Sequence, residues 1–155
     1  HLFTLDASIG EFLLTRRGLR MPDRGRGYAV NEGRAHTWAP SVRAFVDHLK
    51  TPDKGSGRTY ATRYSASLVA DVHRFLLEGG IYLYPADAGG TGAGKLRVLY
   101  ECHPLALVVE QAGGMASTGA ERVLDVAPTS LHERMPLAIG SRAEVELFDS
   151  FVAKG

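Results

Sequence analysis

Residues 67–84 read SLVADVHRFLLEGGIYLY, and this stretch decides the fold class that the sequence predicts. Apolar residues recur at helical spacing in its first part, which predicts a helix over 66–78 with one buried face. Gly79 stands where a glycine commonly ends a helix, and the apolar and aromatic residues 81–84 predict a strand. A helix that passes directly into a strand is typical of α/β proteins. The apolar helix residues are Leu68, Val69, Val72, Phe75 and Leu76.

Strand-like segments recur along the rest of the chain, and the early ones are joined by short links. A short link permits an antiparallel neighbour, whereas parallel strands need a long crossover connection. The sheet is therefore expected to be mixed. The further predicted strands are 2–5, 11–15, 27–31, 96–101, 114–117 and 136–139.

Three more helices are predicted between or after these strands. The segment 41–50 follows a proline suited to a first helical turn, and the segment 104–112 ends at a pair of glycines. Ser141 and Glu144 form a capping-box pattern that opens the last helix. Alternating helices and strands predict an α/β layered domain with a mixed β-sheet between helices, and we expect one domain over residues 1–155.

Composition excludes several classes of protein. The chain has 155 residues, a formal net charge of +1, and 45% hydrophobic residues. A nucleic-acid binder would usually show a strong basic excess, and no apolar run has the roughly 20 residues that a membrane span needs. Cys102, the single cysteine, cannot form an internal disulfide. We therefore expect a cytoplasmic protein in a reducing environment, without nucleic-acid or membrane partners.

Residues 94–101, GKLRVLYE, combine a strand-like apolar pattern with charged side chains. If they form a strand, alternation places Lys95, Arg97 and Glu101 on one face, with Lys95 and Glu101 about 20 Å apart at opposite ends. Two cations followed by a carboxylate suit an anion site beside a cation site.

Other catalytic patterns in the chain fit less well. Residues 89–95 match G-x-x-x-x-G-K, but Leu96 stands where a P-loop needs Ser or Thr, so a flexible glycine-rich connection is favoured. Asp71 and His73 are two residues apart on a helix, which turns them to different sides and excludes a relay. The chain has no G-x-S-x-G nucleophile elbow, and Cys102 has no evident base.

Three further polar stretches lie near predicted strand ends, where open α/β sheets bind ligands. Each alone is compatible with a structural role. Together they supply arginine, tyrosine and asparagine side chains, which hydrogen-bond phosphate oxygens and hydroxyl groups. The residues alone therefore predict an anion site that suits a sugar phosphate. The stretches are 31–33, 63–64 and 82–85.

At these residues the sequence resembles the C-terminal half of class I fructose-1,6-bisphosphatase. The resemblance covers nearly the whole chain in one order, which makes it more specific than any single motif. The matching stretches are 10–12, YAVNEG (28–33), RYSASLVADVHRFLLEGGIYLYPAD (63–87), GKLRVLYE (94–101), EQAGGMASTG (110–119), PTSLHER (128–134) and IGS (139–141).

The resemblance implies the C-terminal domain of the sugar-bisphosphatase fold. It also implies Mg²⁺-dependent hydrolysis of the 1-phosphate of fructose 1,6-bisphosphate to fructose 6-phosphate and phosphate, in gluconeogenesis or the Calvin cycle. Two or more Mg²⁺ ions would be held mostly by an N-terminal half that this chain lacks, so the fragment alone is expected to be inactive. The family also implies a homotetramer.

Two alternatives remain open. The first is a sedoheptulose-1,7-bisphosphatase, or an enzyme that accepts both substrates. The second is a non-catalytic sugar-phosphate-binding module, which requires a native chain that begins near His1. Because residues 1–5 already alternate like a strand, we expect instead that the chain belongs to a longer protein.

The resemblance also assigns roles to individual residues. Arg97 and Glu101 would be catalytic, Arg97 beside the 1-phosphate and Glu101 as a metal ligand. Arg63 would reach the site of a neighbouring subunit. Arg34 stands where the family usually has a phosphate-binding tyrosine, and an arginine can bind phosphate in a different geometry. The implied substrate-binding residues are Asn31, Arg63, Tyr64, Tyr84, Lys95 and Arg97.

Overall fold

The computed structural model describes residues 1–155 except 54, 56, 58, 90 and 91. The described residues form a five-stranded sheet in the order β4-β3-β5-β9-β7. Strand β3 runs parallel to β4 and β5, whereas β9 is antiparallel to both β5 and β7, so the predicted mixed sheet is confirmed. The bounds are β3 Gly27–Ala29, β4 Ala61–Thr62, β5 Ile81–Tyr84, β7 Met115–Ser117 and β9 Leu137–Gly140.

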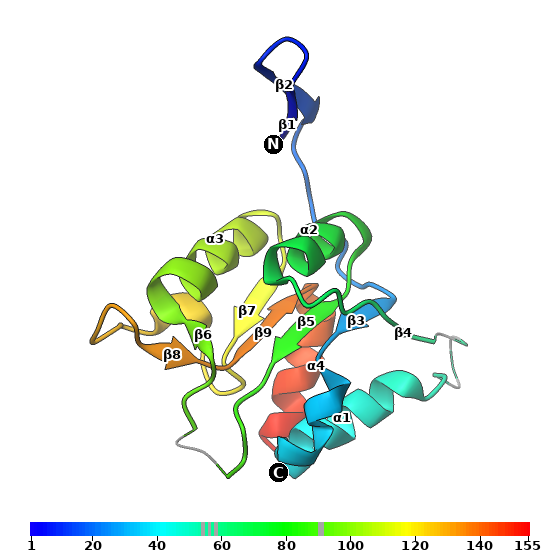
Figure 1. Cartoon of the computed structure of the whole chain (residues 1–155). Helices are drawn as coiled ribbons and strands as arrows, with labels where there is room; N and C mark the ends of the chain where they lie inside the picture. The colour runs from blue at the N-terminus through cyan, green and yellow to red at the C-terminus, as the bar shows by residue number, and fades with distance from the viewer. Residues whose placement is uncertain (54, 56, 58, 90–91) are drawn as a thin grey trace.

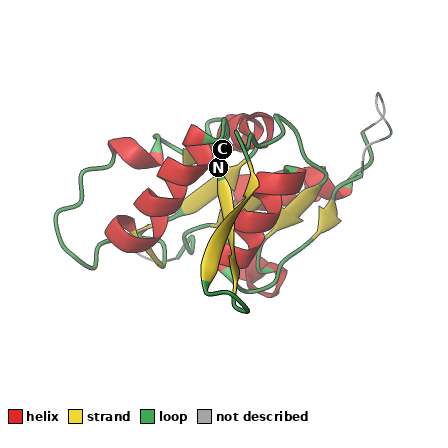
Figure 2. Ribbon diagram, turned by 90° about the horizontal axis from the view of Figure 1, so that it is seen from above, coloured by secondary structure: helices red, strands yellow, loops and turns green. Residues whose placement is uncertain are grey.

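Helices cover both faces of this sheet (Figures 1 and 2). One core joins α2 and α3 to the sheet, and a second core joins α1 and α4 to its other face. The predicted α/β layered architecture is therefore confirmed. No helix in the described part of the chain is long and apolar enough to cross a membrane. The bounds are α1 Pro40–Lys50, α2 Leu68–Glu78, α3 His103–Gln111 and α4 Arg142–Val152.

Strand β5 separates the two cores. Ile81 and Leu83 pack in the core with α1 and α4, whereas Tyr82 packs in the core with α2 and α3. Successive side chains of a strand point to opposite faces, and here both faces are covered. This explains why residues 81–84 are apolar or aromatic without interruption.

The turn between α2 and β5 depends on two glycines. Gly79 ends α2 with a φ of 75°, a left-handed conformation that favours glycine, so the predicted cap is confirmed. The ring of Phe75 packs against Gly80, where an added Cβ would lie 2.7 Å from the ring. A side chain at position 80 would therefore clash with both the Gly27 carbonyl and the Phe75 ring.

A hairpin stands apart from this body (Figure 1). Strands β1 Leu2–Asp6 and β2 Glu11–Arg16 pair with each other in antiparallel register. The register places four large apolar side chains on one face, and all four are exposed. They are Phe3, Leu5, Phe12 and Leu14.

The predicted strand over residues 96–101 is wrong. Strand β6 Leu96–Arg97 pairs with only two residues of β8 Arg134–Met135, and the chain then turns into the π-helix Val98–Cys102 that continues into α3. The run 98–109 buries residues at helical spacing, and a short apolar run is compatible with either structure. The glycine-rich connection before β6 includes residues 90 and 91, which lie outside the described residues.

The capping role of Ser141 is also wrong, although α4 begins where it was predicted. The Ser141 hydroxyl donates to the Pro22 carbonyl at 2.6 Å and accepts from the Gly80 amide at 3.1 Å. Among the described residues it makes no side-chain cap bond to α4. Ser141 instead joins the start of β5 to the segment before β3.

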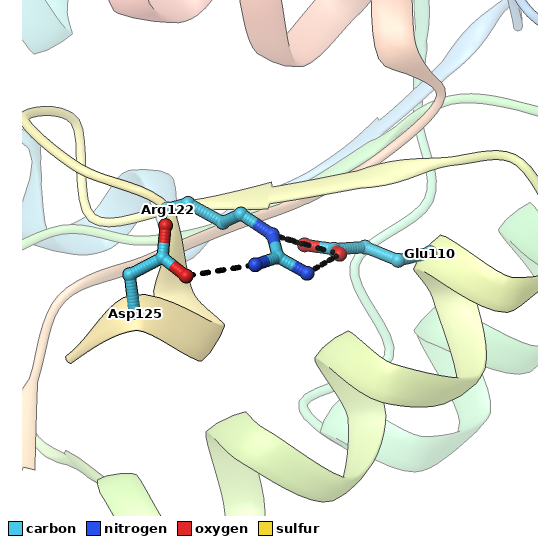
Figure 3. A network of polar contacts seen from close by, with 3 residues as sticks. All are labelled: Glu110, Arg122 and Asp125. Atoms are coloured by element: carbon cyan, nitrogen blue, oxygen red, sulfur yellow. Dashed lines mark hydrogen bonds and ion pairs between the residues drawn. The ribbon is translucent and has the colours of Figure 1, made fainter. Parts of the chain in front are cut away.

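A three-residue ion network holds the short 3-10 helix Val123–Asp125 near α3 (Figure 3). Arg122 donates to both oxygens of Glu110 on α3 and to Asp125 at 2.7 Å. These contacts raise the pKa of Arg122, the bond with Glu110 having the largest effect. A second 3-10 helix, Glu32–Thr37, links β3 to α1.

Candidate functional site

Asn31, Tyr64 and Tyr84 come from three separate segments and lie close together. Asn31 follows β3, Tyr64 lies in the loop before α2, and Tyr84 ends β5. Partial burial raises the pKa of Tyr64, the neighbouring Tyr84 adds to this, and a hydrogen bond with Asn31 opposes it. All three side chains are half-buried, so they remain accessible as hydrogen-bond donors to a phosphate or a sugar.

Arg34 lies at the edge of this group and lines a surface depression with Asn31 and Tyr84. Its Nη2 donates to both carboxylate oxygens of Asp87, at 2.8 and 2.6 Å, and the Thr37 hydroxyl donates to the same carboxylate at 2.7 Å. The bond from Arg34 lowers the pKa of Asp87. Arg34 is thus a cation with a fixed orientation at the predicted anion site.

Lys95 and Arg63 are both exposed cations, and the structure places them differently. The charge of Lys95 acts on Asp87 and helps to lower its pKa, which places Lys95 at the same end of the sheet as Arg34. The Arg63 guanidinium instead donates to the carbonyl of Thr62 at 3.0 Å, beside the edge strand β4. Arg63 therefore lies at an edge of the sheet where a neighbouring molecule has access.

Arg97 and Glu101 contact each other directly, because β6 ends at Arg97 and the π-helix returns Glu101 toward it. The Arg97 amide donates to Glu101 Oε2 at 2.7 Å, and its guanidinium lies 3.3 Å from the same oxygen. The expected arrangement along one face of a long strand is therefore wrong for this pair. The two charged groups instead lie against each other at the start of the π-helix.

Tyr82 lies near both the Asn31, Tyr64 and Tyr84 group and the Arg97–Glu101 pair. Burial raises its pKa, and the neighbouring Tyr64, Tyr84 and Glu101 raise it further. The hydrogen-bonding cluster and the Arg97–Glu101 pair lie on the same side of the sheet, because Tyr64 and Tyr84 pack against the same core as the π-helix that carries Glu101.

Glu101 fits only part of a metal site. Its carboxylate is partly exposed, and oxygen ligands of this kind suit Mg²⁺. Both hydrogen bonds that it accepts from described residues fall on Oε2. Among the described residues, however, no three histidine, cysteine, aspartate or glutamate side chains cluster as a metal site. Glu101 would therefore need ligands from outside this chain.

The sequence interpretation did not single out Asp87, and it named Tyr82 only as part of the polar stretch 82–85. Asp87 could have been noticed because it follows a buried strand by three residues, at the end of the sheet where polar side chains gather. Tyr82 alternates with apolar residues in β5, and the pattern alone does not distinguish it from a core residue.

Comparisons with known proteins identify the family of this chain. The family model for the fructose-1,6-bisphosphatase C-terminal domain matches residues 21–153. The chain is 53% identical to the class 1 fructose-1,6-bisphosphatase of Sorangium cellulosum over 98% of its own length and 43% of that protein. It is 50% identical to the chloroplastic fructose-1,6-bisphosphatase of Brassica napus, with 97% and 36% covered. The chain thus spans less than half the length of these relatives, and it belongs to the fructose-1,6-bisphosphatase family, matching its C-terminal domain.

Proposed function

We propose that this chain forms the substrate-binding part of a fructose-1,6-bisphosphatase. The observation that carries the proposal is the group formed by Asn31, Tyr64 and Tyr84, with cations beside it, in a chain of this family. The reaction would be hydrolysis of the 1-phosphate of fructose 1,6-bisphosphate to fructose 6-phosphate and phosphate. Because the chain spans less than half the length of its relatives, we assign the activity to a longer polypeptide, called here the full-length protein.

One group of residues would bind the substrate, and the other would act at the reacting phosphate. Asn31, Tyr64, Tyr84 and Lys95 would bind the 6-phosphate and the sugar hydroxyls through hydrogen bonds and charge. Arg97 would lie beside the reacting 1-phosphate, where its guanidinium stabilises negative charge. Binding at the first group would orient the substrate so that its 1-phosphate reaches the second.

Glu101 would supply one carboxylate ligand for Mg²⁺, and bound Mg²⁺ would neutralise charge on the transferring phosphoryl group. Two or more ions need more ligands than this chain provides. The remaining ligands are proposed to lie in the N-terminal half of the full-length protein, so this chain alone should release no phosphate.

A homotetramer, in which Arg63 serves a neighbouring subunit's site, also belongs to the proposal. It is supported by the position of Arg63, exposed at the β4 edge. A cytoplasmic location is a further part of it. It is supported by the single cysteine, Cys102, which is buried and cannot form an internal disulfide, as is usual in a reducing compartment.

Phosphate release by the full-length protein tests the function directly. We expect Mg²⁺-dependent release from fructose 1,6-bisphosphate, with a lower kcat/KM for sedoheptulose 1,7-bisphosphate. Lys95→Met should raise KM about 10-fold or more, because it removes a charge-assisted hydrogen bond. Glu101→Gln should lower kcat and raise the Mg²⁺ concentration required.

Two exposed residues on or after α4 provide matched controls. Lys154→Met and Glu146→Gln make the same chemical changes outside the proposed site and should leave the kinetics unchanged. Absence of phosphate release by the wild-type full-length protein would overturn the function. An unchanged Mg²⁺ requirement in Glu101→Gln would exclude Glu101 as a metal ligand.

A further inference from the structure

Asp71 is a fully buried carboxylate in the first turn of α2, and the reaction outlined above does not use it. As expected from their spacing, Asp71 is buried and His73 is exposed, so the two cannot form a relay. A buried carboxylate is costly unless it accepts hydrogen bonds, so its contacts indicate its role.

The contact that compensates the burial of Asp71 is made to the loop that carries Tyr64. The backbone N–H of Ser65 lies 3.2 and 3.1 Å from the two carboxylate oxygens of Asp71. The N-terminal end of a helix also favours a negative charge in its first turn. Asp71 therefore binds the backbone immediately after Tyr64.

Further hydrogen bonds fix the backbone in the rest of this loop. The Arg63 amide donates to the Tyr28 carbonyl at 2.7 Å, and the Arg74 guanidinium donates to the Arg63 carbonyl at 3.1 Å. Ala66 has a φ of 61°, which an alanine seldom adopts. Such a conformation persists only where surrounding contacts determine it, and these occur often at ligand sites.

We propose that Asp71 is a positioning residue that holds the 63–65 backbone so that Tyr64 and Arg63 meet the substrate phosphate. This inference rests on the proposed function and extends it to a residue that does not touch the substrate. Tyr64 is the side chain most affected, because it directly precedes the amide that Asp71 binds and lies beside Asn31 and Tyr84. Without Asp71 the loop would sample many conformations, and substrate binding would have to select the competent one.

Two substitutions in the full-length protein test the proposal. Asp71→Ala removes both acceptor oxygens, and we expect KM for fructose 1,6-bisphosphate to rise about 10-fold while kcat stays within about threefold. Asp71→Asn keeps one acceptor oxygen, and we expect KM to rise about threefold. Hydrogen exchange of the Ser65 amide should follow the same order, fastest in Asp71→Ala and slowest in the wild type.

Ser141→Ala is the matched control. Ser141 is also fully buried and also binds backbone, but at Pro22 and Gly80, at the opposite end of β5 from Tyr84. We expect Ser141→Ala to lower the Tm without changing KM. A purely structural Asp71 would behave in the same way.

Wild-type KM in either Asp71 variant would overturn the proposal, and Asp71→Asn provides this test even if Asp71→Ala does not fold. Absence of phosphate release by the wild-type protein would instead contradict the proposed function. In that case the exchange rate of the Ser65 amide still tests whether Asp71 holds the 63–65 backbone, because that measurement needs no activity.

Discussion

The β1–β2 hairpin and the five-stranded sheet both contain strands rich in apolar residues, but only the sheet buries them. Phe12 in β2 is 67% exposed, whereas Phe75, which packs against the sheet, is 1% exposed. An isolated two-stranded hairpin is marginally stable in water. A short apolar pattern can therefore specify a strand in either region, whereas its burial depends on what lies against it.

One carboxylate from the hairpin and one from α4 also differ, in the direction in which their pKa is shifted. Asp6 in the hairpin is only partly exposed, and hydrogen bonds from Ser8 lower its pKa. Asp149 on α4 is partly buried, and burial raises its pKa although a hydrogen bond with Ser117 opposes this. The surroundings therefore shift the same chemical group in opposite directions in the two regions.

Replacement of one phenylalanine in each region should give the largest difference in the free energy of unfolding. In the 155-residue chain, Phe75→Ala should reduce the free energy of unfolding by about 3–5 kcal/mol, because it leaves a cavity at the centre of a core. Phe12→Ala should leave it almost unchanged. Urea denaturation of both variants measures this, and equal losses would contradict the comparison.

The next prediction concerns Phe12 in the full-length protein. The family model for the C-terminal domain begins at residue 21, although the relatives align over nearly the whole chain, hairpin included. If the N-terminal half covers the apolar face of the hairpin, Phe12→Ala should there cost about 1.5–3 kcal/mol. An unchanged free energy of unfolding in the full-length protein would show that Phe12 stays exposed.

Asp149→Asn should have a smaller effect on thermal stability, and the size of this effect should depend on pH. A carboxyl group whose pKa is raised in the folded state destabilises the protein once it ionises, so wild-type stability falls as pH rises above the ordinary value of 3.8. The amide cannot ionise, so Asp149→Asn should have the higher Tm at pH 7. Thermal unfolding between pH 7 and 4 should show this advantage disappearing. Asp6→Asn, in the exposed hairpin, should show no such gain.

The smallest effect is expected for Arg122→Ala. Arg122 is about half exposed, and exposed ion pairs contribute little to stability because solvent and salt screen them. We expect the Tm to fall by at most about 3 °C, and by less in high salt. Arg142→Ala, which removes a longer pair at 4.0 Å to Glu146, is the control and should be neutral. A large loss in Arg122→Ala would show that the network in Figure 3 is needed to hold the 3-10 helix.

Local sequence patterns were enough to predict α2, its glycine cap and β5. Helical spacing, a cap residue and a strand pattern are properties of neighbouring residues, and all three appear within residues 67–84. The arrangement of helices and strands as an α/β layered domain followed from these local patterns. The polar residues near strand ends were also predictable, because open α/β sheets bind ligands there.

Which polar residues contact one another depends instead on how distant segments fold together. Strand β6 pairs with only two residues of β8, which lies almost 40 positions further along the chain, and the π-helix begins directly after them. Because the strand ends there, Arg97 contacts Glu101, whereas alternation along a longer strand had placed these two residues apart. Likewise, Asp71 binds the amide of Ser65 because α2 folds back over its own preceding loop. Spacing describes one element at a time, whereas these contacts depend on where another element ends, and so they appear only in the folded chain.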